Sequence, residues 1–411
     1  MGRKENIDVE PGKAWKNVLL LAFGQKKMFK NPLVAFLHFI VYGGFIIVNI
    51  EVMEIIIDGI FGTHRVLGGV LGNLYPWLIH AFEVLALLVI VACAVFLIRR
   101  NGVKVWRLWH SDLKGWPRSD ANYILIFEIL LMSAFLCMNA SDSLLATRGI
   151  GAYAVHAYGP FAISQYLAPL FEGLSSGTLI VLERFFWWFH IAGILFFLNY
   201  LPYSKHLHIL YAFPNSYYAR PERIGKMQNM PVIQKEVALA MGADISGDPV
   251  LSGLPDAPPD QFGSKDIFDL SWKNLLDAYT CTECGRCSAA CPANITGKLL
   301  SPRLIMMKTR DRCEEIKTSV TNNGQWNDDG KSLLHDYITV EELRACTACT
   351  ACVEECPVSI SPLDIIMQLR RYLILDESNS PVEWNVMFGN IENNYAPWKF
   401  NPEERTGWIP S

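Results

Sequence analysis

Eight of the eleven cysteines fall into two short runs near the end of the sequence, and each run reads CxxCxxCxxxCP. Three thiolates with two residues between neighbours let a tight loop wrap one face of a 4Fe–4S cubane, and the fourth, before a proline, points to a second cluster. The spacing therefore predicts two clusters with crossed ligands. The expected ligands are Cys281, Cys284, Cys287 and Cys356 for cluster one, and Cys346, Cys349, Cys352 and Cys291 for cluster two.

The alternative chemistry for these cysteines is structural zinc, which also takes four thiolates. Zinc sites usually pair two CxxC units across a long gap, whereas each run here places four cysteines within eleven residues. The sequence begins without the apolar core of a signal peptide, so we expect a reducing compartment and no disulfides. The other thiols, Cys93, Cys137 and Cys313, are interpreted as small packing residues.

Long apolar stretches in the first half of the sequence indicate membrane spans. The chain is 51% apolar and only 18% charged, below the roughly 25% charged residues of soluble domains. Four segments reach the ~20 residues that cross a bilayer, and they are Leu33–Ile57, Pro76–Ile98, Ala121–Leu145 and Leu179–Leu201. We expect an interfacial helix over the amphipathic stretch Ala14–Phe29, with a fifth span as the alternative, and a short surface helix within Tyr158–Leu174.

Basic residues gather in the loops at one end of these spans. They are Lys26, Lys27, Lys30, Arg99, Arg100, Lys104, Arg107, Lys114 and Lys205. The loops at the other end carry Arg65 and Arg148. The positive-inside rule then places both termini in the cytoplasm, with the chain in the inner membrane of a prokaryote. The net charge of −4 gives no argument for nucleic acid, and no Gly-rich phosphate fingerprint follows a predicted strand.

Composition divides the chain into five parts. They are an N-terminal amphipathic segment (1–30), a membrane domain (31–214), a polar linker (215–265) with Pro255–Pro259 at its clearest point, a two-cluster ferredoxin domain (266–375) and an extended arm (376–411). Helical sequence between the cysteine runs favours a helical ferredoxin over the minimal β-type. The expected fold is an all-α membrane bundle of about four spans, five being the alternative, joined to a cytoplasmic helical ferredoxin-like domain with two 4Fe–4S clusters.

Histidines in the membrane domain are the second group that could do chemistry. His38, His80 and His190 lie within spans, and His206 and His208 follow the last one. Ionisable residues in the bilayer are costly and are functional candidates by default. His190 and His208 are 18 residues apart, five turns of one helix, so they are expected to share a helix face. This arrangement suits one or two haem b groups held by pairs of imidazoles.

Depth in the membrane favours one pairing of these histidines over the other. His80 and His190 are expected at a similar level near the outer side, whereas His38 and His208 match only if the helix continues past Pro202 or the first span tilts. His206 is the substitute for His208. The alternative is that the histidines only hydrogen-bond neighbouring helices.

Two further ionisable residues, Glu83 and Glu128, also lie within spans. Each could relay protons to a quinone or be an ordinary glutamate satisfied inside the bundle.

The end of the membrane domain resembles the last span of cytochrome b subunits of the respiratory nitrate reductase gamma type. The matching stretches are Trp187-Trp188-Phe189-His190, Pro202-Tyr203-Ser204-Lys205-His206-Leu207-His208, Arg99-Arg100 and Arg118-Ser119-Asp120. The resemblance implies two histidines on the last span that bind different haems, with His38 as the first-helix ligand. The second ligand of that helix would fall on Val48, which cannot bind iron, unless His80 substitutes for it.

The whole chain resembles the fused iron–sulfur oxidoreductases related to membrane-bound heterodisulfide reductases. The matching stretches are Asp269-Leu270-Ser271-Trp272, Cys281-Thr282-Glu283-Cys284-Gly285-Arg286-Cys287, Thr296-Gly297-Lys298 and Leu300-Ser301-Pro302. In fused relatives a cysteine-rich CCG-type catalytic domain follows, but no two cysteines are adjacent here. The resemblance implies that a separate CCG-type or flavin dehydrogenase-type subunit supplies catalysis, and no catalytic residue is assigned to this chain.

These observations predict an electron-transfer subunit of a membrane quinone oxidoreductase. Electrons would pass between a cytoplasmic partner, the two clusters, haem b and a menaquinone or ubiquinone in the bilayer. One alternative is a haem-free membrane anchor and iron–sulfur relay. The other is a redox-driven ion-translocating subunit, which Glu83 and Glu128 support.

Overall fold

The computed structural model describes residues 1–155, 158–220, 225–227, 229–254, 261–399 and 401–409. The regular structure in these residues is helical, with two isolated β-bridges and no strand. The linker prediction at Pro255–Pro259 lies outside the described residues. An all-α chain was the class that the sequence predicted, and the fold confirms it.

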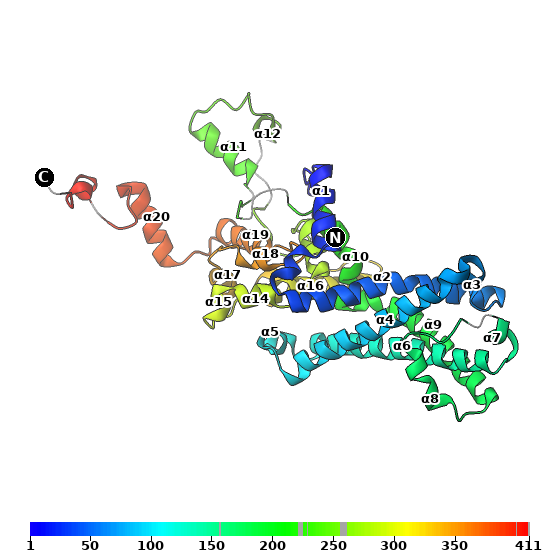
Figure 1. Ribbon diagram of the computed structural model, residues 1–411. Coiled ribbons are helices and arrows are strands. Elements are labelled where there is room, and N and C mark those ends of the chain that lie inside the picture. Colours follow the sequence, from blue (N-terminus) through cyan, green and yellow to red (C-terminus); the bar gives the residue numbers. More distant parts are fainter. Residues whose placement is uncertain (156–157, 221–224, 228, 255–260, 400, 410–411) are drawn as a thin grey trace.

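Four long helices form a bundle whose outer surface is apolar (Figure 1). They are α2 (Pro32–Phe61), α4 (Tyr75–Leu97), α6 (Trp116–Thr147) and α9 (Ser176–Tyr200). Each is long and apolar enough to cross a membrane, which confirms the four expected spans. The helices pack in chain order, α2 on α4, α4 on α6 and α6 on α9. The Asn31 and Ser175 side chains cap the first and last of them by accepting from the backbone N–H groups of Val34 and Thr178.

The N-terminal segment consists of short helices. They are α1 (Pro11–Asn17), the π-helix η1 (Val18–Phe23) and the 3₁₀-helix η2 (Lys26–Lys30). None reaches the length of a span, which removes the fifth-span alternative for Ala14–Phe29. Figure 1 shows α1 running across the direction of α2, the orientation that an interfacial helix takes. Within Tyr158–Leu174 the structure has η6 (Ser164–Tyr166) and α8 (Ala168–Phe171).

The helix that carries His190 does not continue to His208. After α9 come η7 (Leu201–Tyr203), an extended Ser204, η8 (Lys205–Leu207) and α10 (His208–Tyr217). The buried Asp120 carboxylate of α6 holds this break by accepting hydrogen bonds from the Tyr200 hydroxyl, the Ser204 hydroxyl (3.0 Å) and the Lys205 N–H (3.1 Å). The expectation that His190 and His208 share one helix face is therefore wrong, because the chain changes direction between them.

The remaining connections of the bundle are short helices. They are α3 (Val66–Leu71), η3 (Gly72–Leu74), η4 (Ile98–Gly102), α5 (Trp106–Trp109), η5 (Ser111–Leu113) and α7 (Gly151–Val155).

The cysteine runs lie in a second helical unit at one end of the bundle (Figure 1). Its helices are α13 (Trp272–Thr280), α14 (Arg286–Ala290), α15 (Pro292–Ile295), α16 (Pro302–Asn323), η9 (Leu333–Tyr337), α17 (Val340–Arg344), α18 (Ala351–Glu355) and α19 (Pro362–Leu375). Its core is separate from that of the bundle and includes the fully buried Ile305, Ile365 and Leu369. The linker carries α11 (Pro231–Ala240) and α12 (Pro249–Ser252), and the tail carries α20 (Val382–Asn394) and η10 (Pro402–Thr406), which project from this unit.

Candidate metal centre

The two cysteine runs adopt the same local conformation. In each, a loop carries the first two cysteines and leads into a single helical turn, α14 or α18, that carries the third. The second and fourth residues after the first cysteine have positive φ in both loops: Glu283 and Gly285 in the first, Ala348 and Thr350 in the second. Consecutive amides in such a loop turn toward one centre and favour negative charge there. The repeated conformation suits two similar anionic groups.

The fourth cysteine of each run lies among the thiols of the other run. Burial, together with the nearby Cys284 and Cys281 thiols, raises the pKa of Cys356 to about 12. Burial likewise raises the pKa of Cys352 to about 12, and its neighbours are Cys346, Cys291 and Cys349. The structure thus groups the cysteines into the same two sets of four that their spacing predicted. Iron binding at these thiols stays a prediction.

The first run is held directly against the loops of the bundle. The Arg107 guanidinium, from the loop between α4 and α6, donates to the Cys284 carbonyl. The fully buried Arg303 donates to the Arg107 carbonyl (2.6 Å) and pairs with Asp112 of the same loop (3.0 Å). Arg286 donates to the Lys27 carbonyl, just before α2 (3.1 Å).

Glu283 connects the first run to the segment that follows the C-terminal end of α9. Its buried carboxylate pairs with the Lys205 ammonium (2.6 Å) and with Arg310 of α16. Burial acts to raise the pKa of Glu283, but the two cations outweigh it and hold the pKa below its usual value. Every connection of the bundle on this side therefore contacts the first cysteine loop.

A cavity of about 260 Å³ joins the first run to the membrane histidines. His38 and His208 line it together with Cys281, Cys284, Cys287, Cys352 and Cys356. His206 lies beside this pair, with its ring centroid 5.5 Å from that of His208. The break at Ser204 is what returns His208 toward the start of α2. The structure thus brings His38, His206 and His208 together, next to the cysteines.

The rings of His38 and His208 are oriented as metal-ligating imidazoles usually are. Nδ1 of His38 faces the side-chain carbonyl of Gln25 (2.9 Å), and Nδ1 of His208 faces the backbone carbonyl of Lys205 (3.0 Å). A carbonyl accepts a hydrogen bond from Nδ1–H, which keeps the proton on Nδ1 and leaves the lone pair on Nε2 to bind a metal. Burial lowers the pKa of His208, and it lowers that of His206 to about 3. The rings of His206 and His208 are therefore neutral, the form that ligates iron.

The other two candidate histidines are not brought together in the same way. Nδ1 of His190 faces the Leu131 carbonyl (3.1 Å), and its Nε2 is buried without a hydrogen-bond partner. The cavity at this ring is about 60 Å³ and is lined by residues such as Gly44 and Glu128, but not by His80. His80 packs instead on Trp77 and Phe161. Haem b is held by pairs of imidazoles: His38 and His208 line one cavity, whereas His190 is the one histidine among the described lining residues of its smaller cavity.

Buried acids cluster at the end of the bundle opposite the cysteines. Glu83 accepts from the Asn139 amide (3.0 Å) and from the N–H groups of Ile163 (2.7 Å) and Ser164 (3.1 Å). It is thus satisfied within the bundle. The buried Arg65 pairs with Asp142 (2.5 Å).

Sequence reasoning missed Glu51 and Glu54, which belong to this cluster. Both are buried on α2, and Glu54 accepts from the Tyr75 hydroxyl (2.8 Å). Their spacing on one helix face with Asp58 was the signal that could have found them.

The fold and the cysteine geometry define a membrane-capable helical protein with a 4Fe–4S dicluster domain. The family model described as "4Fe-4S dicluster domain" matches residues 273–357, which span both runs. No solved structure matches the chain.

Curated relatives are iron–sulfur oxidoreductases and components of such enzymes. The chain is 28% identical to the probable iron-sulfur-binding oxidoreductase FadF of Bacillus subtilis, over 99% of this chain and 56% of that protein. It is 27% identical to the EtfAB:quinone oxidoreductase of Syntrophomonas wolfei, over 95% of this chain and 53% of that protein. It is 28% identical to one component of a CoB-CoM heterodisulfide reductase of Methanosarcina acetivorans, over 27% of this chain and 55% of that protein. The chain thus spans about half the length of the relatives it matches.

Proposed function

We propose that the chain is the electron-transfer subunit of a membrane-bound quinone oxidoreductase. It relays electrons between a cytoplasmic partner, two 4Fe–4S clusters, haem b and the membrane quinone pool. The observation that carries this proposal is the cavity in which His38 and His208 lie beside the first cysteine run. The similarity to a relative named EtfAB:quinone oxidoreductase supports it, as does the resemblance of the membrane domain to haem-binding cytochromes.

In this proposal some residues bind the cofactors and others hold those ligands in position. The two sets of four cysteines hold the clusters, and His38 and His208 hold haem b, with His206 as a substitute ligand. Bound clusters and haem supply one-electron redox steps. Gln25 and the Lys205 carbonyl fix the two imidazole rings, and Arg107 and Arg303 fix the first cysteine loop over them.

The exposed end of the path is the second cysteine run. Cys349, of the second cluster set, is the exposed member of the eight ligand cysteines, whereas the four cysteines of the first set are buried or half-buried. A soluble partner of the CCG-domain or flavin dehydrogenase type therefore meets cluster two, and cluster one faces the membrane. Basic loops on the side of the cluster domain support a cytoplasmic location for that side and for both termini.

An optical spectrum of the purified protein tests the haem assignment. Reduction by dithionite should give a b-type haem band that is lost in His208→Ala and in His38→Ala. His190→Ala is the matched control and should keep the band, because its ring lies in a cavity of about 60 Å³. Full iron–sulfur content with no haem band in the wild type would instead favour the haem-free anchor.

The ion-translocating alternative draws on the buried acids at the far end of the bundle. Glu51, Glu54, Glu83 and Asp142 are buried there with the single buried cation Arg65, among the residues that the structure describes. Ionisable residues buried at membrane depth are candidates for a proton path. A proton gradient formed during turnover in liposomes, and lost in Glu51→Gln, would support this alternative, and a scalar reaction would remove it.

A further inference from the structure

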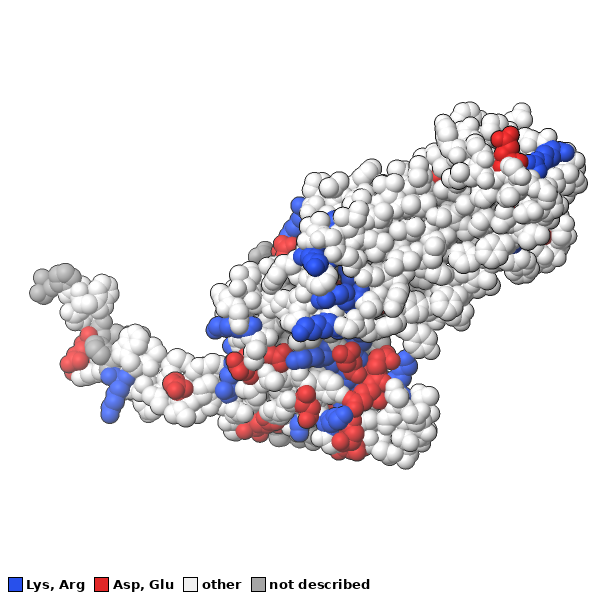
Figure 2. Space-filling view, turned by 90° about the horizontal axis from the view of Figure 1, so that it is seen from below, with Lys and Arg blue, Asp and Glu red and all other residues white. Residues whose placement is uncertain are grey.

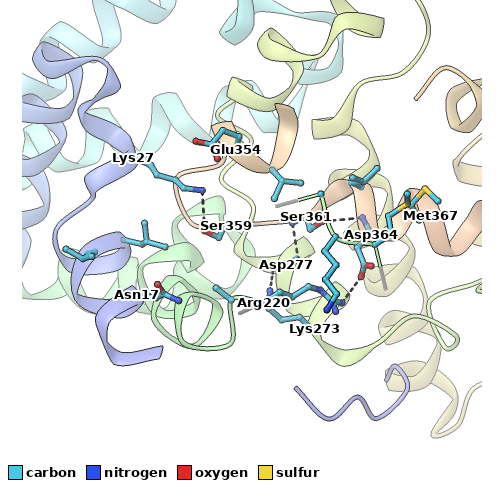
Figure 3. A pocket seen from close by; sticks show the side chains of 18 of the residues that line it. Asn17, Lys27, Arg220, Lys273, Asp277, Glu354, Ser359, Ser361, Asp364 and Met367 are labelled. Carbon is cyan, nitrogen blue, oxygen red and sulfur yellow. Dashed lines mark hydrogen bonds and ion pairs between the residues drawn. The ribbon is translucent and has the colours of Figure 1, made fainter. Parts of the chain in front are cut away.

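A second cavity, of about 580 Å³, lies between the N-terminal segment and the cluster domain (Figure 3). Residues of η1 and η2 form one wall, and residues of α13, α18 and α19 form the other. Among the residues that the structure describes, seven lysine and arginine side chains line it, against three aspartates and glutamates. An excess of one sign of charge in a concave site concentrates ions of the opposite sign. The cavity therefore favours an anion.

The carboxylates of this cavity are already neutralised. Each lies in an ion pair with a lining cation: Lys273–Asp277 at 2.6 Å, Arg220–Asp364 at 2.8 Å and Lys30–Glu354 at 3.8 Å. These pairs account for the acidic side chains, and Lys26 and Lys27 of the lining stand outside them.

These two lysines of η2 carry positive charge that the ion pairs of the cavity do not use. Lys27 donates to the Ser359 hydroxyl across the cavity (3.4 Å), as Figure 3 shows. Lys26 is exposed and has no ion pair or hydrogen bond within the described ranges. Neither ammonium group has a carboxylate partner there. Both are free to bind an anion that enters beside Ser359.

The cavity lies at the level where the bundle meets the polar domain. Lys30 ends η2, and α2 begins two residues later at Pro32. Figure 2 shows blue basic side chains gathered between the white surface of the bundle and the charged domain below it. The adjoining α1 and η1 expose Trp15, Leu19 and Phe23, whose exposed fractions are 59%, 60% and 44%. Such a helix lies in the lipid headgroup region, so lipid phosphates reach this cavity.

We propose that this cavity binds the phosphate group of an anionic phospholipid. Lys26 and Lys27 supply point charges for the phosphate, and the Ser359 hydroxyl can donate to one of its oxygens. Leu20 and Leu21, which also line the cavity, face the glycerol and the start of the acyl chains. A soluble phosphate has the same charge, but the leucines and the exposed aromatic rim favour the lipid as its source. The proposal does not depend on the electron path.

Binding of short-chain lipids to the full-length, cluster-loaded protein in neutral detergent tests this site. The probes are dihexanoyl-phosphatidylglycerol, dihexanoyl-phosphatidylcholine and inorganic phosphate, followed by titration calorimetry. The wild type should bind the phosphatidylglycerol and not the phosphatidylcholine. The Lys26→Gln/Lys27→Gln variant should bind it at least 10-fold more weakly, while Lys13→Gln/Lys16→Gln, which removes two charges of α1 outside the cavity, should match the wild type.

Three results would overturn the proposal. Unchanged phosphatidylglycerol binding in the Lys26→Gln/Lys27→Gln variant would place the lipid elsewhere, and equal weakening in the α1 control would reduce the effect to overall charge. Inorganic phosphate that binds as tightly as the lipid would make the ligand a soluble anion. If the double variant loses its clusters, Lys26→Gln alone repeats the test, since that side chain makes no described contact, and it should weaken binding several-fold.

Discussion

The two cysteine runs share a spacing and a backbone conformation but differ in what covers them. The first loop lies under Arg107, Arg303 and Lys205, which come from or contact the bundle. The second leaves Cys349 exposed. Equivalent positions of the two loops show this difference. A Cβ at Gly285 would lie 2.5 Å from Nη1 of Arg303, whereas the equivalent position of the second loop is occupied by Thr350. The first run is thus fixed against the bundle, whereas the second leaves a cysteine at the surface.

The largest effect is expected from the crossed assignment, in which the fourth cysteine of each run binds the cluster of the other run. Cys356→Ser should lose about half of the iron, and the cluster lost should be that of the first run, although the residue belongs to the second. Electron paramagnetic resonance of the reduced protein checks this, because Cys356→Ser should match Cys281→Ser and differ from Cys346→Ser. Cys313→Ser, a buried thiol outside both sets, should keep all the iron. A Cys356→Ser spectrum like that of Cys346→Ser would refute the crossed pairing.

Removal of the cation that anchors the first run should have the next largest effect. Arg303→Met leaves the Asp112 carboxylate without its buried partner, and breaking such a pair costs ~3 kcal/mol. We expect thermal unfolding, followed through cluster absorbance, to shift down by several degrees. A shift near zero would mean that the first run does not depend on the bundle.

The same contact should depend on pH in a defined direction. Burial acts to raise the pKa of Asp112, but the Ser301 hydroxyl (2.6 Å) and the Arg303 guanidinium outweigh it, so the pKa is lowered. A lowered pKa in the folded state gives stability that is present above the unfolded value and is lost as pH falls through the folded one.

Asp112→Asn leaves the buried Arg303 guanidinium without its carboxylate, so it should reduce stability by ~3 kcal/mol at neutral pH, with the difference shrinking below about pH 4. Melting temperatures of variant and wild type between pH 8 and pH 3.5 check this. A difference that grows on acidification would contradict the sign.

The smallest effect is expected at the second run. Arg344 contacts Asn379 through exposed hydrogen bonds, so Arg344→Met should change stability by no more than ~0.5 kcal/mol. Denaturant unfolding beside Arg303→Met makes the comparison direct. Equal losses in the two variants would remove the distinction between the runs.

The sequence was sufficient for features that depend on neighbouring residues. The lengths of the apolar runs predicted the four spans, and the repeated spacing of the cysteines predicted the dicluster domain. The placement of His208 could not be predicted in this way, because the break before it is held by Asp120 of a different helix. The contacts of Arg107 and Glu283 escaped for the same reason, since their partners are distant in sequence. Glu51 and Glu54 look like isolated acids until α4 and α6 are packed beside them.

The cavity shared by His38, His208 and the first run also constrains the order of maturation. Its walls come from residues between Leu21 and Pro362, so a growing chain completes the spans long before Cys356 leaves the ribosome. The membrane domain can be inserted while this cavity is still open on the side where the cluster domain has not yet been synthesised. The late arrival of Cys356 and of the residues up to Pro362 then completes its lining, so the expected last ligand of the first cluster is made only after all the spans.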